Sequence, residues 1–161
     1  MKKLFIPLIS LLMAFPVVSA ALELEPLRAK DVPELLKPPA QGVRVIELWS
    51  LYCVYCEANL RELASLSSAD TEVHAVTVNI DDIGQRNDIA KRLKSANAES
   101  VPARAYAEAS PQRMNYLIDP HWGGETPRTL IIRADGSRQA VSGILTGARF
   151  KALMKGDRQA D

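Results

Sequence analysis

The two cysteines of the chain, Cys53 and Cys56, are the residues whose type and spacing point most directly to chemistry. An apolar run over residues 43–49 leads into them, and a helical pattern follows. A cysteine pair with two intervening residues, placed where a strand ends and a helix begins, can cycle between a dithiol and a disulfide. The unpaired N–H groups and the positive dipole end of a helix N-terminus favour a thiolate there. The spacing therefore predicts a redox site in which Cys53 is the reactive sulfur.

The first 20 residues have the pattern of a secretory signal peptide: two lysines, an apolar stretch and a Val18-Ser19-Ala20 ending. The apolar stretch contains two prolines and is short for a bilayer span, so we interpret residues 1–20 as cleaved, with an uncleaved anchor as the alternative. In an oxidising compartment a cysteine pair usually forms a structural disulfide that stabilises the fold. This pair closes too short a loop to constrain the unfolded chain much, which favours a reversible dithiol.

The remaining chain has the length of one domain and a nearly balanced charge. This balance indicates no nucleic-acid partner and no membrane-surface partner, and no later segment is long and apolar enough to span a bilayer. We expect an extended lead-in over residues 21–41 with a short helical turn near residues 32–37, a folded domain over residues 42–156 and a disordered tail over residues 157–161. The lead-in is too short for a dimerisation domain, so we expect a monomer.

The hydrophobic periodicity predicts alternating strands and helices along the domain. We expect strands over residues 43–49, 72–80, 101–107, 128–133 and 138–144, and helices over residues 53–67, 85–98 and 110–116 and after Thr146. Asp135-Gly136 is a strong hairpin signal between the last two strands. The order predicts an α/β fold in which a central mixed sheet is covered by helices on both faces.

Three features together resemble the thioredoxin superfamily over about residues 43–155. They are Trp49 four residues before Cys53, the Cys53–Cys56 pair, and Thr126-Pro127 at the entrance to a hairpin that a helix follows. The chain is most similar to the exported TlpA-like branch, whose insertion before the hairpin corresponds here to residues 99–125. The resemblance implies a thioredoxin-like fold and a periplasmic thiol–disulfide oxidoreductase.

The resemblance also implies roles for residues around the cysteines. A cis peptide bond at Thr126-Pro127 would pack against them and leave the Thr126 backbone free to pair with an extended substrate. Glu47, six residues before Cys53, matches a buried carboxylate that accepts a proton from Cys56. The apolar neighbours of Glu47 in the sequence agree with burial, and an exposed glutamate is the alternative.

Three aromatic residues, Trp49, Tyr55 and Trp122, complete the expected substrate-contact surface around the cysteines. For Trp122, covering the hydrophobic core is an equal alternative.

The sequence departs from the family pattern at three places. The dipeptide between the cysteines is Val54-Tyr55, so neither thiolate pKa nor redox potential can be carried over from the family. Glu57 stands where a basic residue is common, and its charge opposes thiolate formation. Asn59 replaces a glutamate that is frequent in the TlpA-like helix.

We therefore expect an exported enzyme that reduces disulfides of periplasmic client proteins without a dissociable cofactor or a metal, and that receives electrons from a membrane relay protein. A disulfide oxidase or isomerase is one alternative. The other is a copper-binding chaperone that uses both cysteines as soft ligands. His74 and His121 could in principle add ligands for zinc or copper, but neither has a ligand spacing to the cysteines.

Overall fold

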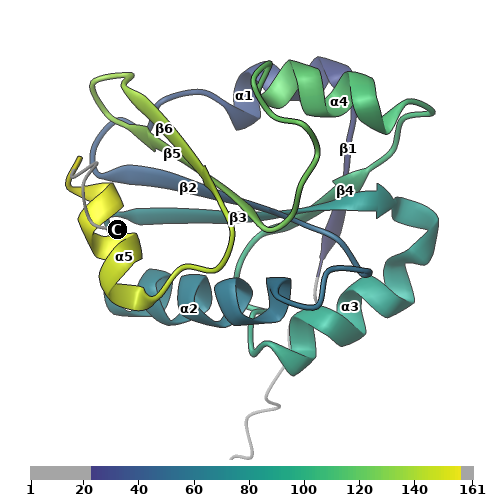
Figure 1. Ribbon diagram of the computed structural model, residues 1–161, viewed down its shortest axis with the longest axis horizontal. Helices are drawn as coiled ribbons and strands as arrows, with labels where there is room; N and C mark the ends of the chain where they lie inside the picture. The colour runs from purple at the N-terminus through teal and green to yellow at the C-terminus, as the bar shows by residue number, and fades with distance from the viewer. Residues whose placement is uncertain (1–22, 157–161) are drawn as a thin grey trace, which may run out of the picture.

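The computed structural model describes residues 23–156, and within them one mixed sheet has helices on both faces (Figure 1). The strands are β1 (Leu24–Leu27), β2 (Val43–Trp49), β3 (Val73–Asp82), β4 (Ala103–Tyr106), β5 (Arg128–Arg133) and β6 (Arg138–Ser142). The helices are α1 (Val32–Leu35), α2 (Cys56–Ala69), α3 (Arg86–Ser95), α4 (Pro111–Ile118) and α5 (Gly147–Met154), with 3-10 turns η1 (Ala29–Asp31) and η2 (Ile83–Gln85).

The strand order of this sheet is β1-β4-β3-β2-β5-β6. β2 pairs antiparallel with β5, which pairs antiparallel with β6, and the remaining neighbours are parallel. The predicted α/β architecture with a central mixed sheet is confirmed.

The side chains of β2 alternate between two separate hydrophobic cores. Val45 and Trp49 pack with residues of α2, α3 and α5 on one face, whereas Ile46 and Leu48 pack with residues of α1 and α4 on the other (Figure 1). Because successive side chains of a strand point to opposite faces, Glu47 belongs to the face covered by α2. The sheet thus places a carboxyl group among apolar side chains, directly beneath the helix that carries Cys56.

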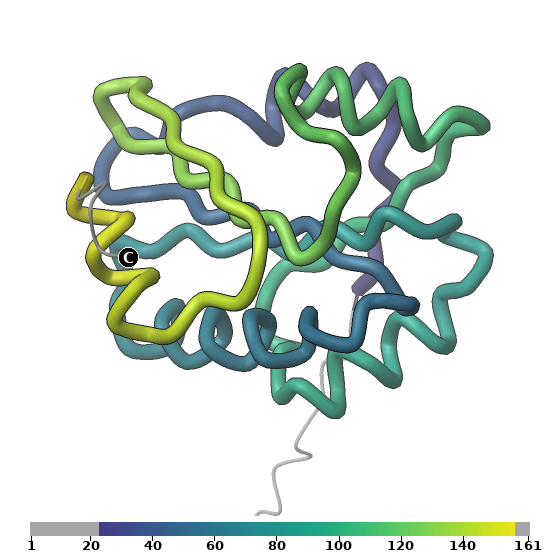
Figure 2. Tube along the Cα trace, in the orientation of Figure 1, coloured from purple at the N-terminus to yellow at the C-terminus, as the bar shows by residue number. Residues whose placement is uncertain are grey.

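The N-terminal segment contains the helical turn that we expected near residues 32–37, as α1, but it is more than an extended lead-in. Leu24–Leu27 is an edge strand that pairs in parallel with β4, and the two run side by side in Figure 2. Leu27 is fully buried, and Val32 and Leu35 of α1 join the same core. The segment is therefore an integral part of the domain. Its four-residue strand contains a proline and a glutamate, so it carries almost no periodic signal.

Residues 99–125, which the resemblance treats as an insertion, contain β4 and α4. β4 lies between β1 and β3, and α4 covers the face opposite α2 (Figure 1). The expected short strand and helix of this stretch are present, and the Ser110 hydroxyl caps the helix by accepting from the N–H of Arg113.

No helix within residues 23–156 is long and apolar enough to cross a membrane. The predicted signal peptide (residues 1–20) and tail (residues 157–161) lie outside the described residues.

Candidate active site

Cys53 and Cys56 form a disulfide just beyond the C-terminal end of β2, with their Cα atoms 5.5 Å apart. Cys53 keeps 8% of its surface exposed, whereas Cys56 has 0%. Cys53 is therefore largely buried but keeps some exposed surface, whereas Cys56 is enclosed by the protein. This asymmetry is what sequential attack on a disulfide requires.

The helix begins later than the sequence predicts. Cys56, rather than Cys53, is the first residue of α2, and Tyr55 is its N-cap. Cys53 lies in the preceding loop, where its backbone N–H donates to the Ser50 carbonyl at 3.2 Å. The disulfide nevertheless holds the Cys53 sulfur beside the first helical turn, whose N–H groups have no partners within the helix. The Cys53 sulfur thus lies at the N-terminus of α2 although its residue precedes the helix.

Asp81, at the end of β3, holds the loop that carries Cys53. Its carboxylate accepts from the Leu51 N–H at 2.7 Å and from the Ser50 hydroxyl at 3.1 Å. Asn79 Nδ2 donates to the same carboxylate at 3.2 Å, and the Ser50 hydroxyl accepts from the Tyr52 N–H at 3.1 Å. No pattern in the sequence singled out Asp81 as part of the site. Its contact with a loop 30 residues earlier depends on the parallel pairing of β2 and β3.

Glu47 is fully buried, as the resemblance implies. Thr129 Oγ1 of β5 lies 2.6 Å from Glu47 Oε2, and Asn59 Nδ2 of α2 donates to Glu47 Oε1 at 3.0 Å. Burial raises the pKa of Glu47 to about 8, although the hydrogen bonds from Thr129 and Asn59 act in the opposite direction. A carboxyl group with this pKa can hold or release a proton near neutral pH.

Asn59 connects this carboxyl group to the segment that follows β6. Its Nδ2 also donates to the Gly143 carbonyl at 3.1 Å, and its Oδ1 accepts from the Leu145 N–H at 2.9 Å. In the sequence Asn59 stood out only as a departure from the family pattern. Its role in the site becomes visible when α2 is packed on the sheet, as does that of Thr129.

The Thr126-Pro127 peptide bond is cis. Pro127 is buried and Thr126 half-buried, and the Pro127 carbonyl accepts from the Gly143 N–H at 2.9 Å. Gly143 has a φ of 101°, which favours glycine. Through Gly143 the structure connects the Pro127 loop with Asn59, one turn of helix beyond Cys56.

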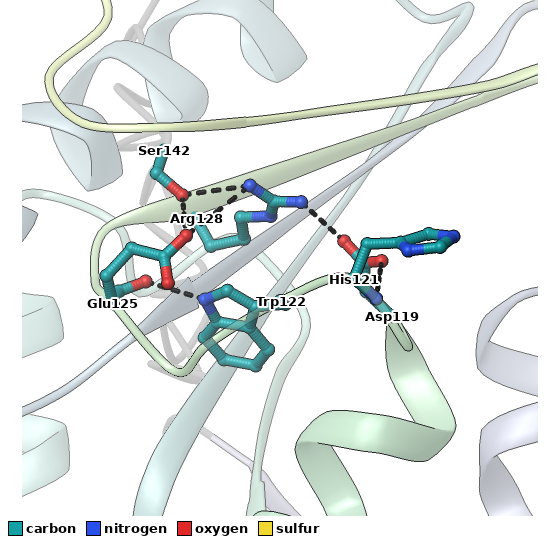
Figure 3. A network of polar contacts seen from close by, with 6 residues as sticks. All are labelled: Asp119, His121, Trp122, Glu125, Arg128 and Ser142. Atoms are coloured by element: carbon teal, nitrogen blue, oxygen red, sulfur yellow. Dashed lines mark hydrogen bonds and ion pairs between the residues drawn. The ribbon is translucent and has the colours of Figure 1, made fainter.

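A polar network on the opposite face supports the same loop (Figure 3). The Arg128 guanidinium donates to Asp119 Oδ2 at 2.6 Å and to the Ser142 hydroxyl at 2.9 Å, and it lies 3.6 Å from a carboxylate oxygen of Glu125. Burial tends to raise the pKa of Asp119, but the hydrogen bond and charge of Arg128 outweigh it and hold that pKa below its usual value. Arg128 thus joins the loop after α4 to β5 and β6.

The predicted substrate-contact residues separate into two groups. Tyr55 is 59% exposed beside the disulfide, where a partner can reach it. Trp49 is fully buried in the core with both cysteines, and Trp122 is 6% exposed in the other core, with its Nε1 donating to the Glu125 carbonyl (Figure 3). Because both tryptophans are buried, neither forms part of an exposed substrate-contact surface as we expected. For Trp122 the alternative, covering the hydrophobic core, is observed.

Sequence reasoning missed other apolar surface near the disulfide. Tyr52 and Val54, in the cysteine loop, are more exposed than Tyr55, and Ile144, between Gly143 and Leu145, is also exposed.

The two histidines lie apart from the cysteines in the structure. His74 is exposed near the start of β3, at the end of the sheet remote from Cys53, and its ring contacts the Gln41 carbonyl at 3.1 Å. His121 is exposed in the loop after α4. Among residues 23–156 no group of three or more His, Cys, Asp or Glu side chains is arranged to hold a metal ion.

No family model and no curated protein matches the sequence. Solved structures do match the fold. A thioredoxin-related protein from Neisseria meningitidis serogroup B is 21% identical, with a TM-score of 0.59 over 73% of this chain and 85% of that one. A thioredoxin-family thiol:disulfide interchange protein from Chlorobium tepidum is 16% identical, with a TM-score of 0.58 over 78% and 83%.

A third similar structure is a secreted disulfide oxidoreductase from Mycobacterium tuberculosis, described as homologous to DsbE of E. coli. It is 16% identical, with a TM-score of 0.56 over 73% of this chain and 84% of that one. The chain therefore has the thioredoxin fold, and the resemblance inferred from its motifs is confirmed at the level of the fold.

The buried Glu47 predicts that the free energy of unfolding falls as the pH rises from about 4.5 to about 8, with a contribution of up to about 1.4 kcal/mol per pH unit. In this range the folded protein keeps the Glu47 proton, whereas the unfolded chain has lost it. The contribution is complete below about pH 4.5 and absent above about pH 8. Urea unfolding of oxidised wild-type and Glu47→Gln protein across this range measures it. Parallel pH dependence in the two proteins would contradict a buried, proton-holding Glu47.

For the Arg128 network we expect Arg128→Ala to lower the free energy of unfolding by about 2–4 kcal/mol, because it leaves Asp119 largely buried without its charged partner. Lys91→Ala is the matched control, since it removes the exposed ion pair with Asp88 and should cost about 0.5 kcal/mol or less. Denaturant unfolding of the wild type and both variants measures these differences in the free energy of unfolding. Equal losses would mean that the Arg128 network does not stabilise the loop.

Proposed function

We propose that the chain is an exported thiol–disulfide oxidoreductase that reduces disulfides of periplasmic client proteins. The observation that supports it best is the disulfide itself, which pairs a cysteine that keeps some exposed surface with a fully buried one, close to the helix under which Glu47 is buried. The fold agrees with this activity, because the secreted Mycobacterium tuberculosis protein of the same fold is described as a disulfide oxidoreductase.

In the first step the reduced protein reacts through Cys53. Its thiolate attacks one sulfur of a client disulfide, a mixed disulfide forms between Cys53 and the client, and the other client sulfur leaves as a thiolate. Cys53 is assigned this attack because it keeps 8% of its surface exposed, whereas Cys56 keeps none.

In the second step Cys56 attacks the Cys53 sulfur of the mixed disulfide. The Cys53–Cys56 bond forms, the bond to the client breaks, and the client leaves as a dithiol with two electrons from the enzyme. Cys56 must lose its proton to react, and in this proposal Glu47, whose carboxyl group is hydrogen-bonded to Asn59 in the first turn of α2, accepts that proton. A pKa of about 8 suits this task near neutral pH.

Clients bind in this proposal along the edge formed by Thr126 and Pro127, with Tyr55 as an exposed apolar contact. Thr126 is half-buried and precedes β5, so an extended client segment can pair with its backbone. The enzyme works as a monomer and needs no cofactor or metal. A membrane relay protein with its own dithiol returns two electrons to the Cys53–Cys56 disulfide and restores the reduced enzyme.

The cysteine variants test the activity. Cys53→Ser should abolish reduction of a protein disulfide such as that of insulin, because no nucleophile remains to attack it. Cys56→Ser should accumulate mixed disulfides, because Cys53 still attacks but no second thiol resolves the bond. Turnover and non-reducing gel electrophoresis measure these results. Full activity in both variants would show that the redox assignment is wrong.

The reduction potential of the Cys53–Cys56 couple decides between a reductase and a disulfide oxidase or isomerase. A reductase should have a potential below about −200 mV, whereas a value well above it favours the oxidant. Equilibration with glutathione or dithiothreitol buffers gives the potential. A copper chaperone would instead carry stoichiometric Cu(I) on the reduced cysteines and lack insulin-reducing activity, so copper analysis of the reduced protein tests that alternative.

A further inference from the structure

Three hydrogen bonds fix the side-chain amide of Asn59. The Leu145 N–H donates to one amide atom at 2.9 Å, and this atom must therefore be the oxygen. The amide nitrogen then donates to Glu47 Oε1 at 3.0 Å and to the Gly143 carbonyl at 3.1 Å. Asn59 is fully buried, so a rotated amide would leave several polar groups without partners or water.

This orientation distinguishes the two oxygens of the Glu47 carboxyl group. Oε1 faces an N–H group that can only donate, so a proton on Oε1 would oppose another hydrogen. Oε2 lies 2.6 Å from the Thr129 hydroxyl, which can either donate or accept. A proton on Glu47 is therefore favourable only on Oε2.

We propose that Asn59 and Thr129 divide the two oxygens of Glu47 between two tasks: Oε1 always accepts from Asn59, and Oε2 alone carries the exchangeable proton. When Glu47 is protonated, its Oε2–H donates to Thr129 Oγ1. When Glu47 is ionised, the Thr129 hydroxyl donates to Oε2. Both states of a fully buried carboxyl group are then hydrogen-bonded, and only a hydroxyl group has to rotate between them.

This inference rests on the proposed function, because the arrangement has a role in catalysis only if Glu47 accepts the proton of Cys56. It then explains how Glu47 takes up that proton without a movement of heavy atoms. Asn59 and Thr129 are positioning residues in this scheme, because they act on the reaction only through Glu47.

The sheet provides a matched control for Thr129. In the register of the strands, Glu47 lies between Thr77 of β3 and Thr129 of β5. Both threonines are fully buried, but within the described part of the chain the Thr77 hydroxyl has no hydrogen-bond partner. Thr77→Val and Thr129→Val therefore remove the same hydroxyl from equivalent neighbours of Glu47, and only the second removes a contact with its carboxyl group.

Infrared spectroscopy of the oxidised protein at about pH 6, below the pKa of Glu47 of about 8, tests which oxygen carries the proton. The C=O stretch of protonated Glu47 is identified by subtracting the spectrum of Glu47→Gln. Asn59→Leu should shift this band to higher wavenumber, because the carbonyl oxygen Oε1 loses its donor. Thr129→Val should shift it less, and Thr77→Val should leave it unchanged. A larger upward shift in Thr129→Val than in Asn59→Leu, or no shift in either, would overturn the proposal.

Titration of the same band gives a second readout. Asn59→Leu and Thr129→Val should each raise the pKa of Glu47 by about one pH unit, since each removes a hydrogen bond that is stronger to the ionised carboxylate than to the neutral carboxyl group, whereas Thr77→Val should not. If Asn59→Leu does not fold, Asn59→Asp keeps an acceptor for the Leu145 N–H but replaces the N–H that faces Glu47 by an oxygen. The two carboxyl groups then share a proton, and the protonated Glu47 band should persist to higher pH. Titrations equal to that of the wild type in the folded variants would overturn the proposal.

These spectra need no turnover, so the two proposals can fail separately. Full activity of Cys53→Ser and Cys56→Ser would remove the redox function, while the spectra would still decide how the Glu47 proton is held.

Discussion

The structure depends most on one constraint: a carboxyl group that lies in the dry interface between a sheet and a helix must be hydrogen-bonded in each of its protonation states. Glu47 has this position on β2, and its partners come from β5 and α2. Leaving such a group without partners would cost several kcal/mol, which is comparable with the net stability of a domain. Strand pairing between β2 and β5 and the docking of α2 are therefore determined here by polar contacts as well as by apolar packing.

The two sulfurs differ because they belong to different kinds of structure. Cys56 is in the first turn of α2, and its side chain joins the core with Leu60 and Leu63. Cys53 is in a loop whose backbone is held by the Asp81 carboxylate. A loop held by side-chain hydrogen bonds can present a sulfur at the surface, whereas a helix that packs on the sheet directs the next sulfur inward. The functional asymmetry thus follows from where β2 ends and α2 begins.

The sequence was sufficient for the features that local pattern encodes. The hydrophobic periodicity predicted the fold class and the cysteine spacing predicted a redox pair, while the resemblance to the thioredoxin superfamily implied that Glu47 is buried. It was not sufficient where a residue acts through tertiary contacts. Asn59 contacts Gly143, 84 residues later, and nothing in its neighbourhood in the sequence indicates that contact.

The tryptophans and the N-terminal segment are two further cases in which tertiary contacts, and not the local sequence, determine the structure. A tryptophan next to a reactive site is compatible with both surface and core, and only packing places Trp49 and Trp122 in two different cores. β1 exists because β4 offers it an edge to pair with, so a weak local signal becomes a strand through a partner far along the chain. Two consecutive residues of β5 also act through contacts that their positions in the sequence do not indicate. Thr129 faces α2 and contacts Glu47, whereas Arg128 faces the opposite side and binds Asp119. The Pro127 loop is therefore held from both faces of the sheet by the two residues that follow it, and alternation along one short strand couples its position to the carboxyl group on one face and to the α4 loop on the other.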